Sequence, residues 1–124
     1  MAATDDARLH LPLTTAVFHV LLALAQGDRH GYGIIQDVTA ATGGEVTLRT
    51  GTLYTILKRL LDEELIVESD RRPAAHEDDD RRRYYGLTRH GRAVVQAEAQ
   101  RLEQMVKLAR SRDMLPRPAR GGRG

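Results

Sequence analysis

The chain has 124 residues, which is enough for one compact domain and too few for two full-sized ones. Hydrophobic residues make up 41% and charged residues 29%, a balance that favours a folded core over disorder. Because the sequence has no cysteine, a disulfide scaffold, a zinc ribbon and a thiol nucleophile are excluded. The longest apolar stretch, Ala16 to Ala25, is too short to cross a bilayer, and the acidic start lacks the basic region of a secretory signal. A soluble, cytoplasmic protein is expected.

The net charge is only +2, but the basic residues are seventeen arginines and two lysines. The planar, bidentate fork of arginine suits phosphates and the edges of guanine. A GC-rich genome produces the same bias, so composition alone leaves both explanations open. The positions of the arginines have to decide between them.

In chain order, the pattern first predicts a flexible polar arm over residues 1–12. A helix from Leu13 to Gln26 follows, apolar on nearly every side and therefore buried on most faces. A second helix runs from about Tyr32 to Thr42 and stops at Gly43 and Gly44.

The segment from Glu45 to Leu48 is either a connector or a brief strand. A third helix is predicted from about Thr50 to Glu63, because apolar residues recur on one face, namely Leu53, Ile56, Leu57, Leu60 and Leu61. Its opposite face is polar and carries Thr52, Thr55, Arg59 and Asp62.

Two segments with strand composition come next, Leu65 to Glu68 and Arg83 to Leu87, separated by a charged loop over residues 70–82. They predict a hairpin. Thr88 then caps a long helix that reaches about Arg112, roughly 36 Å at ~1.5 Å per residue. Residues 113–124 are expected to form a disordered basic tail.

Three helices followed by a hairpin is the element order of a winged helix-turn-helix. The expected fold is therefore mainly α (α+β), with a two-stranded wing and a long C-terminal dimerisation helix. The predicted organisation is an arm (1–12), a winged helix-turn-helix DNA-binding domain (13–88), the dimerisation helix (89–112) and the tail (113–124).

The third helix has the properties of a recognition helix, with small hydroxyls that allow close approach to DNA and cations around them. Backbone N–H groups near Gly51 and Thr52 add a phosphate site at its start. A merely solvated amphipathic helix is the alternative, which the basic wing base disfavours because such residues contact phosphate. The predicted DNA-binding residues are Arg49, Thr50, Thr52, Thr55, Lys58, Arg59, Tyr32, Tyr54, Arg81, Arg82 and Arg83.

Four blocks of sequence carry a family resemblance: His30-Gly31-Tyr32-Gly33-Ile34-Ile35, Gly51 to Leu60, Leu65-Ile66, and Arg81 to Thr88 with Gly91-Arg92. In this order and spacing they resemble the PadR family of transcriptional regulators, from about Leu13 to Arg110. The single C-terminal helix resembles the smaller subfamily. The resemblance implies a homodimer that binds palindromic promoter DNA, represses transcription and is released by small hydrophobic effectors.

The tyrosines and glycines also have explanations in packing. Gly31-Tyr32-Gly33 is not a dinucleotide-binding motif, because Gln36 stands where a third glycine is needed. Tyr32 and Tyr54 either contact DNA or pack with their hydroxyls at the rim. Tyr84 and Tyr85 alternate along a strand, so one is expected to face the core.

Neither a metal site nor a catalytic site is expected. His76 beside the acidic run Glu77 to Asp80 is typical of a solvated loop tip, and those carboxylates repel phosphate. The two serines, Ser69 and Ser111, lie in no nucleophile motif. No cofactor is predicted, and an enzyme is disfavoured.

The long helix carries an apolar seam spaced by four and three residues, Val95, Ala99, Leu102, Val106 and Ala109. This seam predicts dimerisation, with packing on the first helix of the same subunit as the alternative. The helix has no aromatic residue to stack a flat effector, so the tentative effector site is aliphatic, around Phe18 and Leu102. A rival function is a winged-helix module that binds protein, for which a polar third helix is unsuited.

Overall fold

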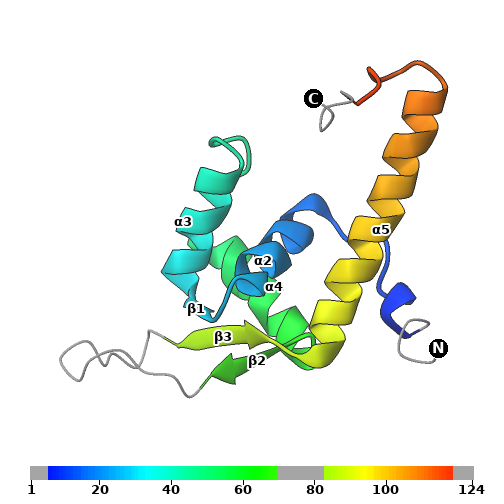
Figure 1. The fold of residues 1–124 in the computed structure, drawn as a ribbon. Helices are drawn as coiled ribbons and strands as arrows, with labels where there is room; N and C mark the ends of the chain where they lie inside the picture. The colour runs from blue at the N-terminus through cyan, green and yellow to red at the C-terminus, as the bar shows by residue number, and fades with distance from the viewer. Residues whose placement is uncertain (1–5, 70–82, 119–124) are drawn as a thin grey trace.

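The computed structural model describes residues 6–69 and 83–118. Its elements follow in the order α2 (Thr15–Ala25), β1 (Arg29–His30), α3 (Gly31–Ala41), α4 (Thr50–Asp62), β2 (Ile66–Ser69), β3 (Tyr84–Leu87) and α5 (Arg89–Ser111). Figure 1 shows α2, α3 and α4 gathered with the sheet into one body, from which α5 extends. None of the helices in the described ranges is long and apolar enough to span a membrane.

Helix α2 is the centre of this body. Thr14 caps it, its side-chain oxygen accepting a hydrogen bond from the backbone N–H of Val17 at 3.1 Å. Residues on several of its sides are buried, namely Val17, Val20, Leu21, Ala23 and Leu24. The helix that the sequence predicted to be buried on most faces is confirmed.

Helices α3 and α4 are joined by a connector that contains two glycines. The side chain of His30 caps α3 by accepting from the N–H of Gly33 at 3.1 Å. Gly43 and Gly44 then adopt φ of +61° and +86°, a conformation that glycine adopts without strain. Residues 45–48 form no strand and are a connector, which decides between the two predicted possibilities.

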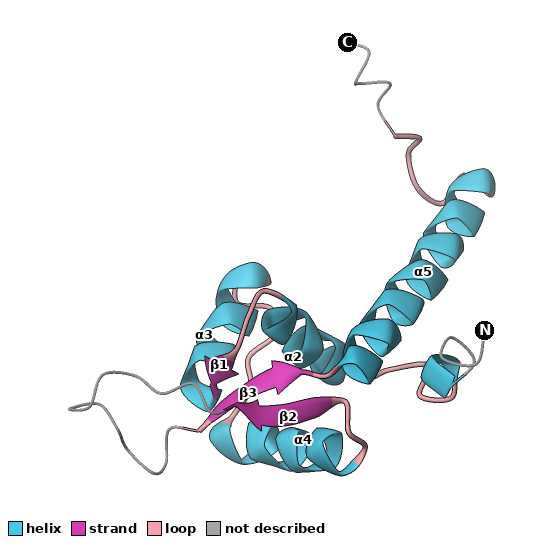
Figure 2. Ribbon diagram, turned by 60° about the horizontal axis from the view of Figure 1, so that its bottom comes forward, coloured by secondary structure: helices cyan, strands magenta, loops and turns pink. Residues whose placement is uncertain are grey.

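The sheet is small and antiparallel, with strand order β1-β3-β2 (Figure 2). Arg29 pairs with Tyr85, and Ile66 pairs with Leu87. The two-stranded wing predicted from the sequence is confirmed as the pairing of β2 with β3, and β1 adds a third strand beside β3 that was not predicted. With two residues, β1 is too short to show any periodicity.

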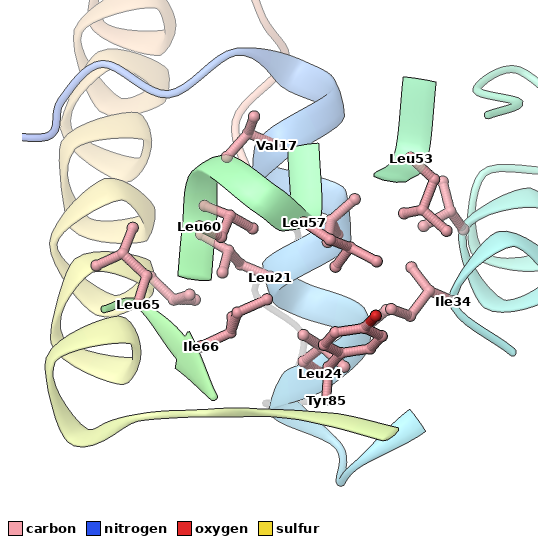
Figure 3. Packing of buried hydrophobic residues seen from close by; sticks show 14 of the residues in the cluster. Val17, Leu21, Leu24, Ile34, Leu53, Leu57, Leu60, Leu65, Ile66 and Tyr85 are labelled. Atoms are coloured by element: carbon pink, nitrogen blue, oxygen red, sulfur yellow. The ribbon is translucent and has the colours of Figure 1, made fainter. Parts of the chain in front are cut away.

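The core joins α2, α3 and α4 to one face of the sheet (Figure 3). Leu53, Leu57 and Leu60 of α4 are at most 1% exposed, which confirms the apolar face predicted for that helix. Tyr85 is 4% exposed while Tyr84 is half-buried, so the predicted alternation is also confirmed. Each large side chain buried here stabilises the fold by roughly 1.5–3 kcal/mol.

Helix α5 packs on the body along its first half, where Gly91, Val94, Val95 and Glu98 are buried. The Thr88 hydroxyl accepts from the N–H of Gly91 at 2.9 Å and donates to the carbonyl oxygen of Glu64 at 2.7 Å. A Cβ at Gly91 would overlap the backbone carbonyl oxygen of Leu65, so a glycine is required at this crossing. The second half of α5 extends beyond the body (Figure 1), and the whole helix is about 35 Å long.

The N-terminal segment corrects one prediction. Residues 6–8 are helical and Ala7 is 1% exposed within the core, while Leu11 packs against that core. The flexible arm predicted for residues 1–12 is therefore wrong over residues 6–12. Residues 6–12 have no hydrophobic periodicity, so their sequence does not indicate that residues far along the chain cover them.

The segment that follows α5 is also ordered at its start. After α5, the N–H of Met114 donates to the carbonyl oxygen of Ala109 at 2.9 Å, and the Arg110 side chain donates to that of Pro116 at 2.8 Å. The predicted disordered tail thus starts with a defined turn at residues 113–118. Residues 1–5, 70–82 and 119–124 lie outside the described residues, and with them Arg81, Arg82, His76 and the acidic run Glu77 to Asp80.

Candidate nucleic-acid interface

One face of α4 is fully available to a partner. The seven predicted contact residues on or before this helix are all exposed, namely Arg49, Thr50, Thr52, Tyr54, Thr55, Lys58 and Arg59. The opposite face is held in the core, so the helix cannot rotate without losing that burial. Small hydroxyls surrounded by cations are the composition that an α-helix needs to enter a major groove.

The start of α4 leaves backbone N–H groups available. Arg49 occupies the capping position and makes no side-chain capping hydrogen bond. Thr55, one turn later, donates its hydroxyl to the carbonyl oxygen of Gly51 at 3.0 Å, which keeps the lone pairs of its oxygen available. An uncapped helix start beside an exposed arginine suits a phosphate oxygen.

Two of the predicted DNA contacts hold carboxylates in the free protein. Arg59 pairs with Glu63 at 3.2 Å, and Arg83 pairs with Glu68 at 3.2 Å. Both pairs are exposed, so each contributes only about 0–1 kcal/mol and a phosphate can displace the carboxylate. Arg49 and Lys58 have no carboxylate partner among residues 6–69 and 83–118.

The two candidate tyrosines differ in their surroundings. Tyr32 is 64% exposed, and its ring lies parallel to that of His30 with centroids 6.4 Å apart. Tyr54 is 41% exposed, but its hydroxyl lies over Gly31, where an added Cβ would come within 2.5 Å of it. The glycine before Tyr32 therefore allows α4 to pack against α3, so Gly31 has a packing role.

The seam predicted on α5 divides into two parts. Val95 is 8% exposed and belongs to the core of its own subunit, which leaves it little surface for the predicted dimer interface. The later members lie where α5 leaves the body, with Ala99 and Val106 exposed and Leu102 and Ala109 partly exposed. Met105 and Leu108 are 53% and 50% exposed on the same half of the helix.

Glu98 is a buried carboxylate that was not predicted from the sequence. It is 1% exposed, binds the Arg101 guanidinium at 2.6 and 3.0 Å, and accepts from the backbone N–H of Leu13 at 3.0 Å. Its position three residues after Val95 and four before Leu102, within an apolar stripe, was the available signal. The hydrogen bond from Arg101 lowers the pKa of Glu98, with the Leu13 N–H adding to this and burial opposing it.

The ionised side chain of Glu98 is expected to make the free energy of unfolding depend on pH. Because the pKa of folded Glu98 lies below its ordinary value of 4.5, its stabilisation is complete above that value and is lost as the pH falls through the folded pKa. Arg101 is partly solvated, so we expect Glu98→Gln to lower the free energy of unfolding by only about 1 kcal/mol at pH 7.

Urea unfolding at pH 7 and pH 3 measures this effect. The difference between wild type and Glu98→Gln should be smaller at pH 3 than at pH 7, because the stabilisation by the ionised carboxylate declines as the pH falls below 4.5. Glu103→Gln, at an exposed position on the same helix, is the control and should match the wild type at both pH values. An equal loss for Glu98→Gln at both pH values would contradict a stabilising charge.

A hollow of about 670 Å³ lies between the N-terminal segment and α5. Its walls are apolar at Leu11, Ala97 and Met105, and its polar lining includes Gln100, Gln104, Arg8 and Arg101. Neither Phe18 nor Leu102, the predicted effector residues, is among the lining residues.

These features define a winged-helix protein. The second helix of its helix-turn-helix, α4, has an exposed face that is flanked by basic residues. The model of the transcriptional regulator PadR-like family matches residues 20–97, more than half of the chain. The chain belongs to the PadR-like family of transcriptional regulators. The resemblance first recognised in the sequence blocks is thereby confirmed.

Solved structures share the fold. The complex structure of hsRosR-S4 is 28% identical with a TM-score of 0.60, over 85% of this chain and 78% of that one. A PadR family regulator from Clostridium difficile is 23% identical with a TM-score of 0.65, over 79% and 97%. Bacillus subtilis PadR in complex with operator DNA is 23% identical with a TM-score of 0.57, over 73% and 47%. A search of curated proteins found no match.

Proposed function

We propose that this protein binds a palindromic operator as a homodimer and represses transcription of the adjacent genes. The observation that carries the proposal is the α4 face, where three exposed threonines lie among Arg49, Lys58 and Arg59 while the other face is fixed in the core. A surface that binds protein is more often apolar or aromatic, so this face favours DNA over the rival function. The Bacillus subtilis relative, solved with operator DNA, supports the same conclusion.

In this proposal, the bases are recognised from α4 and the backbone is held around it. Thr50, Thr52 and Thr55 approach the base edges with Arg49 and Arg59, and Lys58 contacts phosphate. Tyr32, Tyr54 and Arg83 contact the sugar-phosphate backbone on either side, together with Arg81 and Arg82 outside the described residues. Contacts to the base edges specify the DNA sequence, and contacts to the sugar-phosphate backbone position the protein on the DNA.

The dimer follows from the exposed half of α5. Leu102, Met105, Val106 and Leu108 leave apolar surface beyond the body, and a two-fold copy of the same helix covers it with equivalent residues. Two recognition helices related by that axis bind two half-sites in opposite orientation, so the operator is palindromic.

We further propose that a small hydrophobic molecule releases the protein from its operator. The α5 hollow has the volume of a small-molecule site, and Met105 connects it to the proposed dimer face. Residues 89–111 contain no phenylalanine, tyrosine or tryptophan, so an effector in this hollow is held by aliphatic contacts and by the polar lining rather than by ring stacking.

Selection from a random pool of duplex DNA tests the function with no target sequence chosen in advance. The purified chain should enrich one palindromic sequence, and a gel shift with the region upstream of its own gene should show competition by that sequence. A pool that stays unenriched at low salt, where nucleic-acid binding is strongest, would favour the rival function.

The salt dependence of binding gives a second measurable prediction. Lys58→Ala should weaken binding to the operator and to unrelated DNA about equally, and should reduce the slope of log affinity against log salt by about 1.8, because one phosphate contact is lost in each subunit of the dimer. Fluorescence anisotropy at several salt concentrations measures both quantities. Lys107→Ala, the other lysine and exposed on α5, is the matched control and should leave the slope unchanged. A loss confined to one base position would assign Lys58 to base recognition instead.

A further inference from the structure

Two histidines that are far apart in the sequence meet where the N-terminal segment crosses the start of α5. The Nε2 atom of His10 lies 3.1 Å from the Nε2 atom of His90, and the ring centroids are 5.1 Å apart. The rings meet at 66°, edge to face. Both residues are partly buried, which limits the positions that their rings can take.

A carboxylate faces the other side of this pair. The Oε1 atom of Glu63, at the end of α4, lies 3.6 Å from Nδ1 of His10. A carboxylate beside Nδ1 favours the tautomer that carries its proton there, which leaves the lone pair on Nε2. A small closure of this 3.6 Å gap gives the arrangement found around metal-binding histidines, in which an outer carboxylate accepts the ring N–H and orients the ring.

We propose that His10 and His90 form a site for a divalent transition-metal ion, with Zn²⁺, Ni²⁺ and Cu²⁺ as the ions suited to imidazole. Two histidine nitrogens at ~2.0–2.1 Å from a tetrahedral ion are about 3.3 Å apart. The observed separation needs only a slight opening to admit the ion. Without the ion, one histidine ring donates a hydrogen bond to the other. When the ion binds, two metal–nitrogen bonds replace that hydrogen bond.

The site has two protein ligands, and water completes the coordination. Among residues 6–69 and 83–118 no group of three or more histidine, cysteine, aspartate or glutamate side chains could hold a metal. The binding is therefore reversible and weaker than in a closed structural zinc site. Its effect is to fasten the N-terminal segment to α5 and to the end of α4, independently of whether the protein binds DNA.

Calorimetric titration of the full, tag-free chain with NiCl₂ or ZnCl₂ tests the proposal. We expect one ion per chain, at least a tenfold loss of affinity in His10→Gln and in His90→Gln, and about a tenfold loss in Glu63→Gln. The ion should also raise the melting temperature of the wild type, reversibly with EDTA, and should not raise that of His10→Gln.

Two other histidines provide matched controls. His19→Gln removes a partly buried histidine of α2, and His76→Gln removes one outside the described residues; both should bind the ion like the wild type. Circular dichroism in EDTA establishes that each variant is folded, and glutamine preserves hydrogen bonding where alanine would not. Absence of binding by the wild type would overturn the proposal, as would binding that survives in folded His10→Gln and His90→Gln or is lost in His76→Gln.

Discussion

A protein carrying Leu102→Glu is expected to sediment as a monomer and to bind its operator at least about a hundredfold more weakly than the wild type. The substitution places a carboxylate in the apolar face that the exposed half of α5 presents, where an unpaired charge loses its hydration. A monomer holds only one half-site at a time and loses the avidity of the pair. Analytical ultracentrifugation and a gel shift measure the two effects.

Matched variants separate dimerisation from DNA contact. Gln104→Glu adds the same charge at an exposed position two residues further on, on the opposite side of the helix, and should remain dimeric. Arg59→Ala should remain dimeric and lose the operator. Val106→Glu, at a position that is 39% exposed in the single chain, repeats the test where a folding defect is not expected. A dimeric Leu102→Glu protein with normal affinity would mean that α5 does not form the interface.

Gly91→Ala is expected to destabilise the fold by about 3 kcal/mol or more, and to lower the melting temperature by about 10 °C. The added methyl group would overlap the carbonyl oxygen of Leu65, which also accepts the backbone N–H of Thr88 at 3.1 Å. Backbone atoms on both sides leave no flexible side chain to give way, so the start of α5 has to separate from the segment directly before β2.

Gly51→Ala is the control for this effect. Gly51 is also in the first turn of a helix, but an added Cβ would meet nothing within 4 Å. Since alanine favours helix over glycine, this variant should be as stable as the wild type or slightly more so. Thermal unfolding followed by circular dichroism compares the two. Equal melting temperatures for both variants would show that the α5 crossing can relax.

Local patterns were sufficient for most elements of the fold. The apolar residues of α4 recur at helical spacing, and the structure buries that face as predicted. Thr88 was identified as a cap from its type and position, and it accepts the N–H of Gly91. β1 was missed because two residues carry no period, and the packing of residues 6–12 was missed because their burial depends on α5.

The candidate site was predictable to the same extent. Helical periodicity assigns each polar residue of α4 to the exposed face, and the structure agrees for all of them. Helical spacing also brings Glu63 one turn after Arg59, where the two side chains pair. It does not reveal the pair of Arg83 with Glu68, because those residues come together only when β2 pairs with β3. On α5, the same periodicity placed Val95 in an intermolecular seam, whereas the body of its own subunit covers that residue.

By itself, the sequence determined which face of each helix is apolar, where α5 begins and which family the chain resembles, because spacing, capping and motifs act over a few neighbouring residues. Only the tertiary structure decided what covers those faces. The pairing of His10 with His90, the burial of Glu98 against Leu13 and the contact of Gly91 with Leu65 join segments that no local pattern relates. These contacts arise when α5 packs across the body, and that geometry depends on all the packed elements together.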